Sequence, residues 1–234
     1  MRKTVLVTRP EPGATRTAER LQRRGYQPIV LPLTSIEAIA CELPGLDFDA
    51  VAVTSANAMR HAPPDMLARL THLPLFAVGE ATADEGRKAG FGTVTEGAGD
   101  GEQLAAVLRE ELPRGARIAY LTGRVRTAEF ERLVMAGERQ MIAVELYDTK
   151  FITYQENDIR SIFKDIVLDF CLVYSAKGGE ALVELVRRAA GPFSNTKFLC
   201  LSEKIATILN ANGLTKIGVA NRPQEEALLR LIEG

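Results

Sequence analysis

The order of the apolar runs in this chain occurs twice, and this duplication constrains the fold more than any other feature of the sequence. Asp49 to Asn57 aligns with Asp169 to Lys177, and both segments end an apolar run in Ser-Ala. Phe76 to Ala83 aligns in the same order with Leu199 to Ala206. Because agreement over several elements in one order is improbable by chance, we predict a duplicated structural unit.

Short β-branched runs alternate with longer segments of helical period along the whole chain. Such alternation is typical of parallel sheets with crossover helices, and runs that are apolar throughout indicate strands buried on both faces. The predicted strands are Val5 to Thr8, Ile29 to Leu31, Ala50 to Val53, Leu75 to Val78, Ile118 to Leu121, Phe170 to Val173 and Phe198 to Leu201. The fold class is therefore α/β.

A chain of 234 residues is long enough for one large domain or for two of about 100 to 120 residues. A cut at Pro113-Arg114-Gly115 gives two tandem domains. Alternatively, Ile29 to Ile36 pairs with Val144 to Phe151, so that the middle of the chain forms one lobe and both ends form the other. The residues alone leave both divisions open.

Composition excludes several classes of function. Lys plus Arg (29) nearly cancels Asp plus Glu (30), so the chain lacks the basic field that drives non-specific nucleic-acid binding. No apolar run approaches the ~18 residues of a membrane span, and Met1-Arg2-Lys3 leads into a strand rather than into the apolar core of a signal peptide. We expect a cytoplasmic protein with no nucleic-acid or membrane partner.

Cysteine and histidine are few. Cys41, Cys171 and Cys200 include no CxxC pair, so we expect reduced thiols, the last two buried in strands, and neither a disulfide nor a zinc site. His61 and His72 have no partner at triad or metal spacing, and we predict that both are surface loop residues. The sequence thus argues against Ser-His and His-metal chemistry.

Small polar and basic residues stand where predicted strands give way to helices. In open parallel sheets, ligands bind beyond the carboxyl ends of the strands, where helix N-termini present free N–H groups. The candidate binding residues are Thr8, Arg9, Thr54, Ser55, Asn57, Thr82, Thr122, Gly123, Arg124, Ser175, Lys177, Ser202 and Lys204. Helix capping alone accounts for Ser, Thr or Asn at any one junction. Six such junctions around one cleft favour an anion-binding surface.

Two other features are interpreted as structural. Gly97 to Gly101 lacks the spacing of a nucleotide-binding loop, so we predict a flexible connection before a helix over Glu102 to Leu112, and no cofactor. The four arginines of the first helical segment are predicted to form a solvated face; they are Arg16, Arg20, Arg23 and Arg24.

At the strand ends the sequence resembles the uroporphyrinogen-III synthase family. The matching segments are Thr8-Arg9-Pro10, Thr54-Ser55-Ala56-Asn57, Ala77 to Ala83, Tyr120-Leu121-Thr122-Gly123, Val144 to Thr149 and Leu201 to Ala206. They occur in the family's order over nearly the whole chain. The chain departs from the family at Ser202, Lys204 and Ile205, where many members carry a Gly and Thr pair, and Lys204 could instead be an extra carboxylate ligand.

The resemblance implies two flavodoxin-like lobes with parallel sheets, joined by a two-stranded antiparallel ladder, with a cleft between them. It implies a discontinuous lobe of residues 1–36 with 152–234 and an inserted lobe of residues 38–149. It also implies a monomer that cyclises hydroxymethylbilane, a linear tetrapyrrole, with inversion of the last ring, loss of water and no cofactor. A transient contact with the preceding pathway enzyme fits the same picture.

Tyr147 matches the family's tyrosine on the ladder, so the resemblance implies that it donates a proton to the leaving hydroxyl. The alternative for Tyr147 is a strand tyrosine that packs at the hinge. For the chain as a whole, the alternatives are a non-catalytic two-lobed sensor of a small anionic ligand and a flavodoxin-like electron carrier. The sequence lacks the acidic and aromatic flavin loops of the carrier, and no output segment follows Leu231, which favours the enzyme.

Overall fold

A computed structural model of the chain describes residues 2–126 and 128–233. The contacts within the chain divide it into two compact units. The first unit comprises Met1–Ser35 and Lys150–Gly234, and the second comprises Ile36–Thr149. Each unit is described below by itself.

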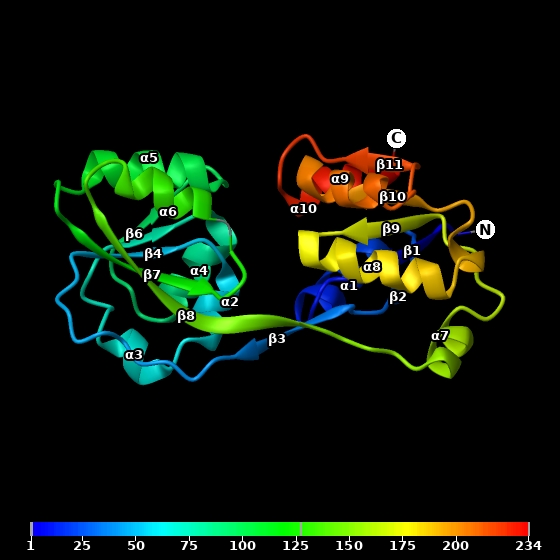
Figure 1. Ribbon diagram of the computed structural model, residues 1–234, viewed down its shortest axis with the longest axis horizontal. Helices are drawn as coiled ribbons and strands as arrows, with labels where there is room; N and C mark the ends of the chain where they lie inside the picture. The colour runs from blue at the N-terminus through cyan, green and yellow to red at the C-terminus, as the bar shows by residue number, and fades with distance from the viewer. Residues whose placement is uncertain (1, 127, 234) are drawn as a thin grey trace. The chain divides into compact units, whose positions relative to one another are not determined.

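The first unit is built on a five-stranded parallel sheet in the order β11-β10-β9-β1-β2 (Figure 1). Its elements in chain order are β1 (Thr4–Val7), α1 (Gly13–Arg23), β2 (Gln27–Val30), α7 (Glu156–Ile162), β9 (Phe170–Val173), α8 (Ala176–Arg188), the 3-10 turn η1 (Gly191–Phe193), β10 (Lys197–Cys200), α9 (Glu203–Ala211), β11 (Ile217–Val219) and α10 (Glu225–Glu233).

The second unit contains a six-stranded sheet in the order β3-β8-β7-β4-β5-β6. Its elements are β3 (Thr34–Ala38), β4 (Ala50–Val53), α2 (Ala56–His61), α3 (Pro64–Ala68), β5 (Leu75–Ala77), α4 (Glu80–Lys88), β6 (Val94–Glu96), α5 (Gly101–Glu111), β7 (Arg117–Gly123), α6 (Ala128–Met135) and β8 (Gln140–Phe151). Strands β4 to β8 pair in parallel.

Strand β3 runs antiparallel to β8. The N–H of Ile39 donates to Leu146 O at 2.9 Å, and the N–H of Ile152 donates to Leu33 O at 3.0 Å, so residue numbers rise along one strand as they fall along the other. The predicted two-stranded ladder is therefore present. The apolar run Ile29 to Ile36 is, however, not one strand, because β2 ends at Val30 and β3 begins at Thr34.

The two sheets share one topology. When β7 is taken as the equivalent of β1, both parallel sheets have the strand order 2-1-3-4-5, which is the flavodoxin-like order. The equivalent strand pairs are those that the sequence duplication aligns, β4 with β9 and β5 with β10. The predicted α/β class with two flavodoxin-like parallel sheets is confirmed.

Alternate strand residues face opposite sides of each sheet, as the period of two requires. In the first unit, Leu6, Cys171 and Cys200 pack with residues of α7, α8 and α9, whereas Val5 and Val7 pack with residues of α1 and α10. Both cysteines are buried, as predicted. Burial, the larger cause, and the charge of Glu203 raise the pKa of Cys200 to about 12, which keeps this thiol protonated and unreactive.

Candidate active site

The carboxyl ends of β7, β4 and β5 lie side by side in the second unit because these strands are neighbours in its sheet. Thr122 and Gly123 end β7, while Thr54 and Ser55 follow β4 and lead into α2. The Ser55 hydroxyl accepts a hydrogen bond from the N–H of Asn57 at 3.2 Å and caps α2. Thr82 lies in the first turn of α4 and is buried. The fold thus gathers the predicted residues of this unit at one sheet edge.

Tyr147 is seated against Gly123. A register shift between Thr122 and Gly123 brings Gly123 opposite Tyr147 on the neighbouring strand β8. A Cβ added at Gly123 would lie 2.5 Å from Tyr147 Cζ and 2.9 Å from its hydroxyl, so the ring occupies the space that any other residue would fill. Gly123, predicted as a binding residue, therefore also forms the surface on which Tyr147 rests.

The phenol of Tyr147 stays protonated at neutral pH. Burial raises its pKa above the ordinary value of 10, and a hydrogen bond with Ser55 opposes this rise without cancelling it. A half-buried, protonated phenol beside the end of β7 is suited to donate a proton to a leaving group.

Two aromatic neighbours were not predicted as site residues. The hydroxyl of Tyr120, on β7, lies 2.8 Å from Thr54 Oγ1, so it holds one of the candidate hydroxyls. The ring of His61 lies 6.1 Å from that of Tyr147. The prediction that His61 is a surface loop residue is wrong, because it ends α2 and is partly buried; His72 is exposed in a turn, as predicted. Burial, and then Arg60, lowers the pKa of His61 and favours its neutral form.

Arg124 follows β7 and is already paired with acidic residues. Its Nε donates to Glu145 at 3.2 Å, and its Nη1 lies 3.8 Å from Asp148. Glu145 also accepts from Arg126 at 2.8 Å. The buried Thr122 hydroxyl donates a hydrogen bond to the Gly123 carbonyl oxygen at 3.4 Å. Arg124 and Thr122 therefore have partners within the chain before any ligand arrives.

In the first unit, the neighbouring strands β10, β9 and β1 bring the other predicted junctions to one sheet edge. The buried Thr8 hydroxyl donates to Leu172 O at 2.9 Å and ties β1 to β9. Ser175 caps α8 by accepting from the N–H of Gly178 at 3.0 Å. The Lys177 ammonium lies 5.0 Å from the centroid of the Phe151 ring.

Ser202 and Lys204 belong to the third of these junctions. Ser202 stands at the N-cap of α9 without a side-chain capping bond, and Lys204 is exposed in the first turn of that helix. Unlike Ser175, Ser202 therefore leaves the first N–H groups of its helix without side-chain capping.

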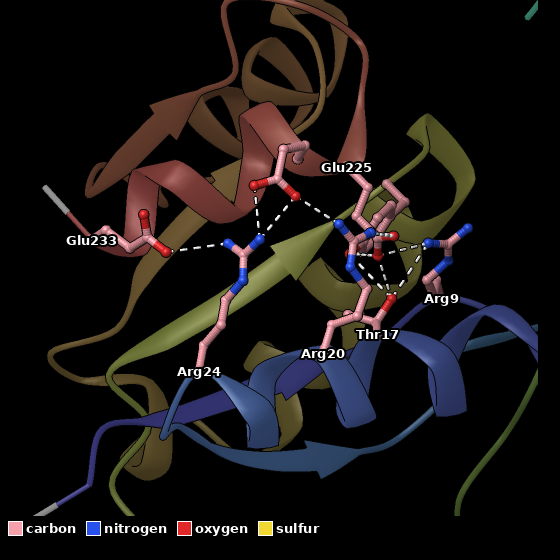
Figure 2. Close-up of polar contacts among 8 residues, drawn as sticks. Arg9, Thr17, Arg20, Arg24, Glu225 and Glu233 are labelled. Atoms are coloured by element: carbon pink, nitrogen blue, oxygen red, sulfur yellow. Dashed lines mark hydrogen bonds and ion pairs between the residues drawn. The ribbon is translucent and has the colours of Figure 1, made fainter. Parts of the chain in front are cut away.

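The arginines of α1 and its C-cap do not all form a solvated face, so that prediction is wrong for Arg20 and for the C-cap residue Arg24. Arg20 donates to Glu225 at 2.5 Å and to Glu226 at 2.6 Å. Arg24 donates to Glu226 at 2.7 Å and to Glu233 at 3.1 Å. As Figure 2 shows, these contacts fasten α10 across α1.

No group of three or more His, Cys, Asp or Glu side chains that could hold a metal occurs within residues 2–126 and 128–233. Across the same residues, no helix is long and apolar enough to cross a membrane.

Two flavodoxin-like units, each with hydroxyl side chains and helix N-termini at its strand ends, define an α/β protein suited to anionic ligands. Comparisons with known proteins identify the family within this class. The model of the family described as "Uroporphyrinogen-III synthase HemD" matches residues 15–230, so the chain belongs to the uroporphyrinogen-III synthase family. Its activity is that of a cyclising lyase of haem biosynthesis. This family assignment supports neither the sensor nor the electron carrier as an alternative.

Solved structures show the same fold. The crystal structure of uroporphyrinogen-III synthetase from Helicobacter pylori 26695 has a TM-score of 0.69 at 18% identity, with 100% of this chain and 99% of that chain covered. A mutant uroporphyrinogen III synthase from the extremely thermophilic bacterium Thermus thermophilus has a TM-score of 0.55 at 15% identity, with 99% of this chain and 97% of that chain covered. The search of curated proteins gives no match.

Proposed function

We propose that the chain cyclises hydroxymethylbilane to the type III macrocycle, with Tyr147 as proton donor to the leaving hydroxyl. The observation that carries this assignment is the position of Tyr147: a protonated, half-buried phenol that packs against Gly123 at the end of β7, on the sheet edge where Thr54 and Ser55 follow the neighbouring strand β4. A modest acid is sufficient, because pyrrole nitrogen lone pairs expel the hydroxyl.

In the proposed reaction, the C–O bond of the hydroxymethyl group breaks as Tyr147 transfers its proton to the oxygen, and water leaves. The resulting azafulvene is attacked by the substituted carbon of the last ring, which forms a spiro intermediate. Rearrangement inverts that ring, and the proton released when the pyrrole regains aromaticity restores the phenol. Because uncatalysed closure gives the non-inverted isomer, the protein acts mainly by holding the chain in the spiro-forming geometry.

The carboxylates of the substrate require N–H and O–H donors. In the second unit we assign this role to Thr54, Ser55, Asn57 and Thr82 with the N-termini of α2 and α4. In the first unit we assign it to Ser175, Lys177, Ser202, Lys204 and Arg9. Thr8, Thr122 and Arg124 support these segments through their bonds within the chain. Charge-assisted bonds from such groups favour an acetate- and propionate-bearing substrate.

The isomer ratio tests the proposal. Purified protein and freshly made hydroxymethylbilane should give mainly uroporphyrinogen III, whereas buffer alone gives the type I isomer. Exclusive type I product at high protein concentration would reject the assignment.

The proposal also includes a monomer that acts in the cytoplasm and meets the preceding enzyme transiently. Sedimentation of the protein alone and with that enzyme, and fractionation of cells, would test these points.

A further inference from the structure

Glu225, in the first turn of α10, joins groups from three other segments of the first unit (Figure 2). Its Oε1 accepts hydrogen bonds from the Thr17 hydroxyl, from the Tyr174 hydroxyl at 2.8 Å and from Arg9 Nη1 at 3.0 Å. Its Oε2 accepts from Arg20 Nη1 at 2.5 Å. We call this set, Arg9, Thr17, Arg20, Tyr174 and Glu225, the Glu225 cluster.

The charges within the Glu225 cluster are fixed at neutral pH. Burial favours the neutral form of Glu225, but hydrogen bonds from Thr17 and Tyr174 with the charges of Arg9 and Arg20 outweigh it, so the pKa of Glu225 is lowered. Burial, and then the Glu225 charge, raises the pKa of Tyr174 well above its ordinary value. Glu225 is therefore an ionised acceptor, and Tyr174 is a protonated donor to it.

Arg9 is held in one orientation by this cluster. Its guanidinium carbon lies 4.2 Å from the centroid of the Tyr174 ring, and Nη1 bonds to Glu225 and Thr17. A Cβ added at Gly13 would lie 2.5 Å from Arg9 Nε, so the guanidinium also rests against Gly13. In the part of the chain that the structure describes, every hydrogen bond of the Arg9 guanidinium uses Nη1, which leaves Nε and Nη2 for another acceptor.

Arg9 and Tyr174 follow β1 and β9, two neighbouring strands, at the sheet edge where parallel sheets bind ligands. Arg9 is also partly exposed. A guanidinium fixed at one nitrogen presents a planar pair of donors that matches a carboxylate, and little side-chain freedom is lost when the carboxylate binds.

We infer that Glu225 and Tyr174 are positioning residues that fix Arg9 as a fork for one carboxylate of the substrate. This inference rests on the proposed function, which assigns a polycarboxylate tetrapyrrole to this edge. Glu225 itself touches no substrate in this scheme, because its oxygens are occupied by donors from the chain.

The first test compares Glu225→Gln with Glu233→Gln. The amide keeps the shape of Glu225 but removes its charge and turns one acceptor into a donor, so Arg9 loses its charged partner. We expect KM for hydroxymethylbilane to rise about 10-fold or more, with kcat within about threefold, as for the loss of one charge-assisted contact. Glu233 lies on the same helix and contacts Arg24, not Arg9, so its variant should keep the wild-type KM.

A double-mutant cycle with Arg9→Ala separates positioning from simple stability. Arg9→Ala should raise KM at least as much as Glu225→Gln, and adding Glu225→Gln to it should raise KM no further. Binding of uroporphyrin III, a stable octacarboxylate, measured by fluorescence, should follow the same order. Additive effects on KM and binding, or an unchanged KM in Glu225→Gln with a lower melting temperature, would show that the cluster only fastens α10 to α1.

Gly13→Ala gives a second route in case Glu225→Gln folds poorly. Gly13 begins α1 without a positive φ, so alanine adds no backbone strain, and the three nearest atoms that its Cβ would meet all belong to the Arg9 guanidinium. We expect a higher KM at an unchanged melting temperature, and an unchanged KM would overturn the inference. The isomer ratio of the wild-type protein is measured separately, so a failure of the proposed function is distinguishable from a failure of this positioning role.

Discussion

Replacing Gly123 with alanine should disable Tyr147 without touching it. The added Cβ would lie 2.5 Å from Cζ and 2.6 Å from Cε2 of Tyr147, whereas ordinary contacts begin at 3.4 Å. The ring must therefore retreat by about 1 Å, and a displacement of that size at a reacting group costs about 100-fold in rate. Gly123 has no positive φ, so the backbone accepts alanine without strain.

We expect Gly123→Ala to lower kcat about 100-fold with KM changed by less than about threefold, because the ring but not the carboxylate ligands is moved. Single-turnover formation of uroporphyrinogen III from hydroxymethylbilane measures the chemical step directly. Gly101→Ala is the matched control in the same unit, since its Cβ would meet Phe130 at an ordinary 3.5 Å.

The combination with Tyr147→Phe shows whether the effect passes through the phenol. If Gly123→Ala acts only by displacing the hydroxyl, the double variant should be little slower than Tyr147→Phe alone. A Gly123→Ala protein that keeps full kcat while its melting temperature falls would refute the reasoning. Tyr147 would then be a packing residue, and the proton would come from solvent or substrate.

Four further outcomes are expected. Tyr147→Phe should lower kcat by about 10- to 1000-fold at nearly constant KM, with residual type III product, whereas Thr82→Ala should mainly raise KM; steady-state kinetics distinguish the two. Chelators should leave the rate unchanged, which an assay with excess EDTA checks. The lowered pKa of Glu225 means that its contribution to stability is complete above its ordinary pKa of 4.5 and is lost as pH falls through the lower folded value. The melting temperature of the wild-type protein should therefore fall toward that of Glu225→Gln in acid, and an equal gap at about pH 3 and pH 7 would contradict this.

The strands and the duplication could be predicted because they depend on local periodicity, and a period of two or 3.6 is visible within a few residues. The contacts of Arg20 and Arg24 could not. Their acidic partners lie on α10, about two hundred residues further along the chain, and only the tertiary fold brings α10 to α1. A solvated helix face and an ion-paired one have the same sequence pattern.

The contacts of Tyr147 with its neighbours could not be predicted from the sequence either. Gly123 was predicted as a binding residue from its place at a strand end. Its contact with the Tyr147 ring depends on a register shift between β7 and β8, which the sequence pattern does not indicate. The prolines Pro63 and Pro64 after His61 favour a loop, but in the structure they begin the next helix. Tyr120 was assigned to a strand correctly, but its contact with Thr54 depends on the register that pairs Tyr120 with Ala52 on β4.

The equivalent ends of β1 and β7 have different roles in the two units. Val7-Thr8-Arg9 aligns with Leu121-Thr122-Gly123, and in both units the threonine is buried and its hydroxyl bonds to a backbone carbonyl. The threonine is thus the shared structural part, and the next residue differs. Gly123 leaves room for the phenol of Tyr147, whereas Arg9 is held by Glu225 and Tyr174 at the equivalent strand end. If this division is correct, substitutions at position 123 change kcat and substitutions at position 9 change KM, although the two positions are equivalent by topology.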